Sequence, residues 1–115
     1  MRVLSGIQPT GEMHIGNYLG AVKQWTELQE RHDCFFAVVD LHALTIQQNP
    51  KEFGKASMEK VVELISVGLN PEQCVLFLQS HVKEHTELAW IFNTLTPVSE
   101  LERMTQYKDK ARKNK

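Results

Sequence analysis

The residues best suited to chemistry lie in the segment SGIQPTGEMHIGN at positions 5–17. Gly11 and Gly16 allow tight turns and a close approach of the backbone to a flat ligand. The polar side chains that could contact such a ligand are Gln8, Thr10, His14 and Asn17. His14 and Asn17 fall on the first turn of an expected helix, where free N–H groups and a partial positive charge suit a phosphate. The segment therefore predicts a nucleotide site, although it contains neither G-x-G-x-x-G nor G-x-x-x-x-G-K-[ST].

The elements that must position this segment alternate between strand-like and helical patterns. The expected strands are residues 2–7, 34–40 and 74–80, and the expected helices are residues 14–31, a helix from Pro50 to a C-cap at Gly68, and residues 84–95. Residues 41–50 are expected to form a loop, Pro97 to end a helix, and Ser99-x-x-Glu102 to form a capping box for a last helix. The order predicts a Rossmann-like α/β fold, a three-layer parallel sheet with flanking helices. Ligands bind beyond the carboxyl ends of such strands.

Apolar side chains at regular spacing indicate which faces are buried. The side chains expected to face the core are Phe35, Phe36, Phe53, Val61, Leu64, Ile65, Leu88, Ile91 and Leu95. Trp25 and Trp90 are expected to be core or interface anchors. Both cysteines, Cys34 and Cys74, lie in apolar strand-like runs and are expected to be buried free thiols, which suits a reducing cytoplasm.

Composition excludes several classes of protein. The chain has 115 residues, 42% of them hydrophobic, which is enough for a folded core. The net charge of −1 argues against a surface built to coat nucleic acid or membrane, although residues 101–115 hold six basic and two acidic side chains. No signal peptide is evident, and no apolar run is long enough to span a membrane. We therefore expect a cytoplasmic protein with no membrane partner.

Four strings in the sequence carry a family resemblance. His14-Ile15-Gly16-Asn17 resembles the HIGH signature of class I aminoacyl-tRNA synthetases, with Asn17 in place of the last histidine. The longer strings SGIQPTGEMHIGNYLGA, AVVDLHALT, LFLQS and ELERMTQYKDK are similar to the tryptophanyl-tRNA synthetases, and together they span nearly the whole chain. Leu4 departs from that family, in which an aromatic residue often ends the first strand.

The resemblance implies a fold, a reaction and partners. It identifies residues 1–115 as the N-terminal part of a Rossmann-like catalytic domain, without the KMSKS-type loop and the anticodon-binding helices. It implies activation of L-tryptophan by ATP to tryptophanyl-adenylate, transfer to tRNA(Trp), Mg²⁺ bound through the ATP phosphates, and a homodimer. The alternative is a non-catalytic ATP-binding or subunit-association module derived from the same fold. The isolated chain is expected to be weakly active or inactive.

The resemblance also assigns roles to individual residues. The residues matched to catalysis are His14, Asn17 and Lys110; those matched to ATP contacts are Gln8, Pro9, Thr10, Gly16 and Asn17; and those near bound tryptophan are Gly6, Gln8 and His42. His14 and Lys110 would reach phosphates, and Gly16 would let adenine stack against the backbone. Without the family, His14 could be a helix cap and Lys110 a solvated charge.

One further pattern suggests a metal site. The string His81-Val82-Lys83-Glu84-His85 spells H-x-x-E-H, which occurs in some zinc peptidases. That motif needs both histidines on one helical face. Here His81 is expected to close a strand and His85 to open a helix, so we assign no metal ligand to the protein.

Overall fold

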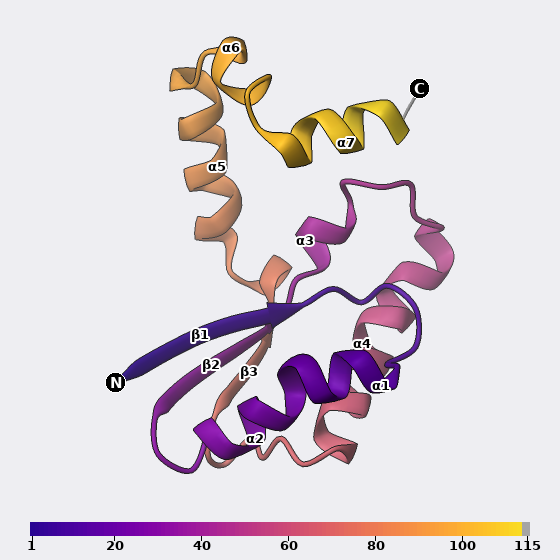
Figure 1. Ribbon diagram of the computed structural model, residues 1–115, viewed down its shortest axis with the longest axis vertical. Coiled ribbons are helices and arrows are strands. Elements are labelled where there is room, and N and C mark those ends of the chain that lie inside the picture. Colours follow the sequence, from indigo (N-terminus) through magenta and orange to yellow (C-terminus); the bar gives the residue numbers. More distant parts are fainter. Residues whose placement is uncertain (114–115) are drawn as a thin grey trace.

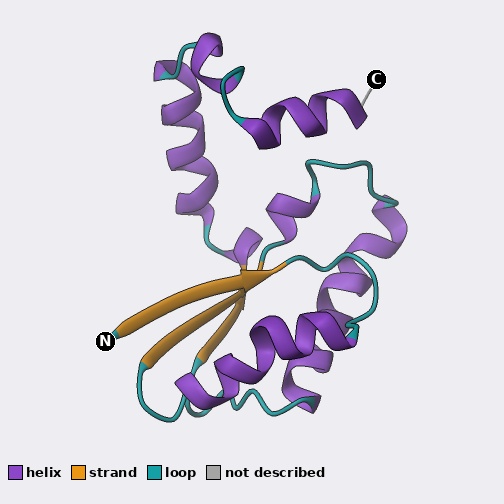
Figure 2. Cartoon of the chain, viewed as in Figure 1, coloured by secondary structure: helices purple, strands orange, loops and turns teal. Residues whose placement is uncertain are grey.

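The computed structural model describes residues 1–113 of the chain (Figure 1). Its strands are β1 (Arg2–Ile7), β2 (Asp33–Val38) and β3 (Val75–Leu78). Its helical segments are α1 (Ile15–Asn17), the π turn η1 (Tyr18–Val22), α2 (Lys23–Leu28), α3 (Asp40–Ala43), α4 (Pro50–Ser66), the 3₁₀ turn η2 (Gln79–His81), α5 (Lys83–Leu95), α6 (Val98–Leu101) and α7 (Thr105–Lys113). Strands and helices alternate up to α5, as the sequence pattern predicts (Figure 2).

Within these residues the three strands form one parallel sheet in the order β1-β2-β3. Leu4 pairs with Phe35, and Phe35 with Val75, so the three strands end close together at the carboxyl edge. The chain crosses from β1 to β2 and then from β2 to β3 in the same direction across the sheet. Because both crossovers have the same hand, their helices lie on the same face of the sheet. Figure 1 shows α2 and α4 on one side of the sheet accordingly. The predicted Rossmann-like α/β fold is confirmed.

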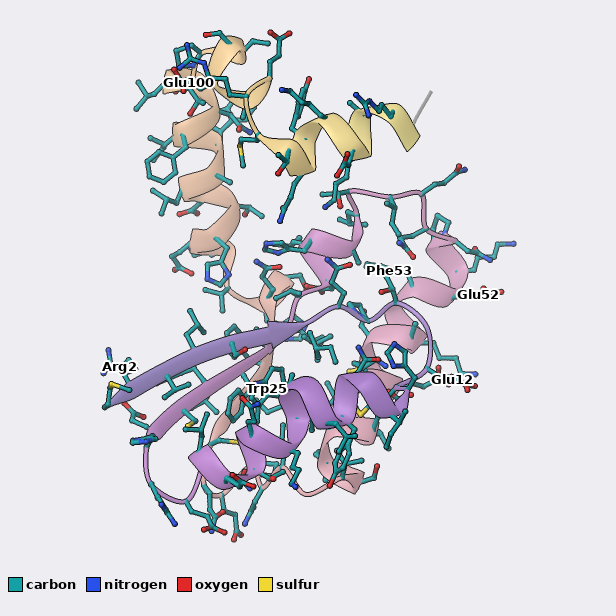
Figure 3. All side chains as sticks on the ribbon, in the orientation of Figure 1. Arg2, Glu12, Trp25, Glu52, Phe53 and Glu100 are labelled. Atoms are coloured by element: carbon teal, nitrogen blue, oxygen red, sulfur yellow. The ribbon has the colours of Figure 1, made fainter. Side chains whose placement is uncertain are left out.

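The core lies between this covered face and the two helices. Trp25 of α2 stacks on Phe36 of β2 with ring centroids 4.7 Å apart and an interplanar angle of 10°. Cys34 and Val38, two residues either side of Phe36, point to the same face and are buried with it. Leu64 contributes from α4. Figure 3 shows Trp25 between α2 and the strands. Trp25 and Phe36 are therefore core residues, as predicted.

The opposite face of the sheet is open. Leu4 is 73% exposed, Val75 is 47% exposed, and Phe35 between them is only partly buried. The expectation that Phe35 belongs to the core is therefore wrong, because strand side chains alternate and Phe35 faces away from both helices. Two of the three layers of the predicted architecture are formed by the described residues, namely the sheet and the helices on one of its faces.

Helix α4 begins and ends as its sequence predicts. Pro50 takes the first helical position, where its missing N–H removes no bond, and Asn49 caps the helix by accepting from the Lys51 N–H at 3.1 Å. Gly68 follows the helix with φ of 111°, a left-handed conformation that favours glycine. Ile65, however, is 44% exposed rather than buried, because the covered face is centred on Ser57, Lys60 and Leu64.

The last third of the described chain departs furthest from prediction. Helix α5 has the predicted length, but Leu88, Ile91 and Leu95 are 51%, 52% and 72% exposed, and Trp90 is 70% exposed. After η2 the helix leaves the sheet edge (Figure 1), so within residues 1–113 the sheet does not cover its apolar stripe.

Three boundaries also differ from those expected. The helix expected over residues 14–31 is interrupted by the π turn and ends at Leu28, and the expected loop 41–50 begins inside α3. The third strand ends at Leu78, and η2 follows. The capping box at Ser99 does not form, because extended Pro97 starts α6 at Val98 and leaves Ser99 inside the helix. Among the described residues no helix is both long and apolar enough to cross a membrane.

Candidate functional site

His14 begins the helical segment that follows β1 and caps it with its own ring. Its Nδ1 accepts hydrogen bonds from the N–H of Gly16 at 3.1 Å and of Asn17 at 3.3 Å, and the Asn17 side-chain oxygen accepts from the His14 N–H at 3.3 Å. A Cβ on Gly16 would lie 3.1 Å from the His14 ring, so glycine leaves the room that the cap needs. Because Nδ1 accepts, the neutral ring carries its proton on Nε2, which is left as a donor.

The loop of residues 8–13 joins the end of β1 to His14. Gly11 adopts φ of 69°, and its carbonyl accepts a hydrogen bond from the Lys60 ammonium group of α4 at 2.9 Å. Pro9 is buried, and Thr10 faces a hollow that the residues after α3 and the start of α4 also line. Figure 3 shows Glu12 near the start of α1. The loop therefore lies along α4, with Gly11 at its anchor.

The ends of β2 and β3 are joined by a buried carboxylate. Asp40 is 6% exposed and accepts hydrogen bonds from Ser80 N–H at 2.9 Å and Ser80 hydroxyl at 2.5 Å. Its Oδ1 also accepts from the Leu41 N–H at 3.0 Å. Sequence reasoning placed Asp40 at the end of a strand and gave it no role. The structure makes it the link between the two strand ends.

This link brings His42 and Gln79 together. The His42 Nδ1 and the Gln79 Oε1 lie 2.9 Å apart, so the ring donates to the amide oxygen and its Nε2 is left as an acceptor. Both side chains line a hollow of about 460 Å³ whose other wall is α5, with Leu88 and Phe92. The hollow also contains the polar side chains of Thr45, His85 and Thr86, and a hollow of this size with an apolar wall and a few polar groups suits a small ligand. Gly6 and Gln8, which the sequence grouped with His42, do not line it.

Lys110 of α7 contacts the segment that follows α3. Its ammonium group donates to the Thr45 hydroxyl at 2.7 Å, and that hydroxyl donates to the His42 carbonyl at 2.7 Å. Figure 1 shows α7 running back toward α3. Lys110 is therefore tied to the segment that carries His42.

A hollow of about 720 Å³ lies between α1 and α4, and His14 is one of its lining residues. Three carboxylates, those of Glu12, Glu59 and Glu63, also line it. Like charges repel, so this hollow is a poor place for phosphates despite its size. Within residues 1–113 no cluster of three or more His, Cys, Asp or Glu side chains is placed to hold a metal ion. His81 closes η2, whereas His85 lies in the first turn of α5.

The two thiols lie at the covered face, away from these groups. Cys34 and Cys74 are free and buried, as predicted. Burial raises the pKa of the Cys34 thiol, and the Asp33 carboxylate raises it further. Burial also raises the pKa of Cys74, to which Cys34 adds. Both thiols are therefore protonated and unreactive near neutral pH.

Comparison with known proteins connects this geometry to a family. A sequence profile described as tRNA synthetases class I (W and Y) matches residues 1–115, the whole chain. The chain belongs to this family. Tryptophan–tRNA ligase 2 of Streptomyces avermitilis is 58% identical over 113 residues, which cover 97% of this chain and 34% of that relative. Tryptophan–tRNA ligase of Rickettsia conorii is 53% identical, over 95% of this chain and 33% of the relative. The chain thus spans about a third of the length of the curated relatives it matches.

Solved synthetases share the fold. The crystal structure of tryptophanyl-tRNA synthetase from Campylobacter jejuni matches with a TM-score of 0.87 and 43% identity, over 98% of this chain and 35% of that one. A crystal structure of the Campylobacter synthetase complexed with ADP and tryptophan matches with a TM-score of 0.89, also at 43% identity, over 98% of this chain and 35% of that one. The resemblance inferred from the four strings is therefore confirmed as a family relationship.

Besides Asp40, two functional candidates escaped sequence reasoning. Lys60 was given no role, and Gln79 was placed only at the end of a strand. The available signal for Lys60 was its place on the apolar side of α4, between Ser57 and Leu64. Lysine is seldom fully buried unless it is paired, so a lysine on that side indicates a specific partner. No signal in the sequence pairs Gln79 with His42, since that contact depends on the sheet register.

Proposed function

We propose that residues 1–115 form the ATP-binding, N-terminal part of the catalytic domain of a tryptophan–tRNA ligase. The reaction is activation of L-tryptophan by ATP to give tryptophanyl-adenylate and pyrophosphate, followed by transfer of tryptophan to tRNA(Trp). The lysine loop of KMSKS type and the anticodon-binding helices lie outside these residues.

The observation that carries the proposal is the His14 cap inside a chain of this family. The ring uses Nδ1 to cap the helix start and keeps Nε2–H as a donor, in the segment that follows the carboxyl end of β1. In parallel α/β sheets ligands bind beyond the carboxyl ends of the strands. A donor held in place by its own helix needs no reorganisation when charge develops on the α-phosphate, which is how electrostatic stabilisation lowers a barrier. The Campylobacter synthetase, complexed with ADP and tryptophan, supports a nucleotide and tryptophan as ligands here.

We assign the other residues the roles that the family resemblance implies. Gln8, Pro9, Thr10, Gly16 and Asn17 surround ATP, with Asn17 holding ribose or phosphate and Gly16 letting adenine approach the backbone. Gly6, Gln8 and His42 lie toward tryptophan. Lys110 would leave the Thr45 hydroxyl to reach the phosphates, which requires α7 to move. Mg²⁺ would enter on the phosphate oxygens of ATP, where it would share the negative charge.

The test is tryptophan-dependent ATP–pyrophosphate exchange. The 115-residue chain is assayed alone and mixed with the complementary C-terminal part of a relative, with tyrosine as the substrate control. Exchange that requires tryptophan, alone or after mixing, supports the proposal. The absence of both exchange and ATP binding would overturn it, and ATP binding with no exchange even after mixing would favour a non-catalytic module.

His14 has two roles, and two variants separate them. His14→Ser keeps a good N-cap but removes the ring donor, whereas His14→Ala removes both. In a chain made competent by mixing, we expect both variants to lower exchange by roughly 10- to 1000-fold. Only His14→Ala should also lose stability, by about 1 kcal/mol. A change in exchange below threefold in His14→Ser would refute the phosphate role.

We propose further that the ligase is a cytoplasmic homodimer. The exposed stripe of Leu88, Ile91 and Leu95 on α5 supports association, because apolar patches of this kind mark interaction surfaces. The two free thiols agree with a reducing compartment. Sedimentation velocity of the chain and of Leu95→Glu tests the dimer. A monomer at high concentration for the unchanged chain would count against it.

A further inference from the structure

Lys60 is a buried ammonium group on a helix face that is otherwise closed to water. Its side chain is 4% exposed, and Ser57 and Leu64 are buried on the same face of α4. Its Nζ donates to the Gly11 carbonyl at 2.9 Å and forms an ion pair with Glu63, one turn along the helix, at 2.5 Å. Both contacts have hydrogen-bonding distances and a charged donor, so together they hold the ammonium group in one position.

Burying a lysine is unfavourable unless partners replace its water. Glu63 offsets the charge, but Glu63 is itself 31% exposed and could pair equally well with a lysine at the surface. An apolar side chain at position 60 would pack beside Leu64 without needing any partner. The contact that only a long, buried donor can make is the one to Gly11, 49 residues away in sequence.

That contact holds a segment with little else to hold it. Within residues 1–113, the bond from Lys60 is the only hydrogen bond described for residues 8–13. Gly11 sits at the middle of this segment, in a left-handed conformation. The hollows on either side contain Thr10 on one side and His14 on the other, and α4 lines both. Lys60 thus fixes the loop at the point between Thr10 and His14.

We infer that Lys60 is a positioning residue that anchors the ATP-contacting loop to α4 through the Gly11 carbonyl, an inference that rests on the proposed function. Lys60 does not touch ATP. It limits the conformations of residues 8–13 before ATP arrives, so less freedom is lost on binding and affinity rises. Removing the anchor leaves the polar side chains of the loop present but loosely placed.

The test compares Lys60→Met with Lys55→Met in the full 115-residue chain. Methionine keeps the length and the apolar stem of lysine but donates nothing. Lys55 is the matched control, because it lies on the same helix and pairs with Glu59 at 3.3 Å, yet its side chain is 78% exposed and makes no contact with the loop. Backbone ¹⁵N order parameters over residues 10–14 report the anchor, and the Kd for ATP, measured by titration with Mg·ATP, reports its consequence.

We expect Lys60→Met to lower the order parameters over residues 10–14 and to raise the Kd for ATP about tenfold, roughly what the loss of one charge-assisted hydrogen bond corresponds to. Lys55→Met should leave the order parameters unchanged and the Kd within twofold. If Lys60→Met does not fold, Lys60→Gln replaces it, since glutamine can pair with Glu63 but is too short for Gly11. Lower order parameters with unchanged ATP affinity would overturn the inference and leave Lys60 a structural residue. Unchanged order parameters would overturn it as well. Failure of the unchanged chain to bind ATP would instead overturn the proposed function, and the inference with it.

Discussion

Replacing Asp40 with alanine tests whether a buried carboxylate holds the two strand ends of the site together. The carboxylate is 6% exposed and accepts two hydrogen bonds from Ser80, one from the backbone and one from the hydroxyl. A hydrogen bond to a charged group contributes about 1.5–3 kcal/mol. Alanine also removes the desolvation cost of the buried carboxylate, which offsets part of that sum, so we expect Asp40→Ala to lower the free energy of unfolding by about 2–4 kcal/mol. Ser80→Ala removes the hydroxyl bond alone and should lower it by about 1.5 kcal/mol.

The pair forms a double-mutant cycle that isolates the hydroxyl bond. Because Asp40→Ala already breaks that bond, the double variant should be more stable than the sum of the two single effects predicts, by about 1–2 kcal/mol. Urea unfolding followed by Trp25 fluorescence measures each variant, in a Trp90→Phe background because Trp90 is exposed and would report solvent instead of packing. A coupling energy below about 0.5 kcal/mol would refute the reasoning, since that is the value expected of independent sites. A large coupling with no loss of stability in Asp40→Ala would mean that burial of the carboxylate cancels its bonds.

Three further outcomes follow from the packing, the thiols and α7. Trp25→Ala should lower the free energy of unfolding by about 3–5 kcal/mol, because it empties a stacked, buried site; the urea midpoint measures the loss. The pKa values of Cys34 and Cys74 are raised in the folded chain, so folding retains protons that the unfolded chain releases. Stability should therefore fall as pH rises through the unfolded-state pKa near 8.5, and the double serine variant should show a smaller fall in urea titrations between pH 7 and pH 10. Lys110→Ala should speed amide exchange in α7 by removing its bond to Thr45, while exchange in β2 stays unchanged.

The fold could be predicted because its signals are local. Period-two and period-3.6 patterns reflect the geometry of strands and helices, and Pro50 and Gly68 mark the start and end of α4 by restricting backbone angles. The His14 segment could be predicted for the same reason, since a polar loop, glycines and a helix start follow one another directly in the sequence.

What could not be predicted depends on contacts between distant parts of the chain. The apolar stripe on α5 indicates that Leu88 and Leu95 suit an apolar partner surface. The spacing of apolar residues cannot identify that surface, and the sheet does not cover them. Charged side chains are assigned to the surface by default, so Asp40 and Lys60 were missed although both are buried. Their burial is tolerated only because Ser80 and Gly11 meet them in the folded chain.

Asp40 and Lys60 anchor different parts of the site, and this separation has a measurable consequence. Lys60 ties the loop after β1 to α4, whereas Asp40 ties the end of β2 to the end of β3, and no described hydrogen bond is shared between the two. Effects at sites without shared partners add to within about 0.3–0.5 kcal/mol. We therefore expect the losses of stability in Lys60→Met and Asp40→Ala to sum in the double variant, as measured by urea unfolding. A deviation above about 1 kcal/mol would mean that the loop and the strand ends form one cooperative unit, in which loosening either anchor already releases the other.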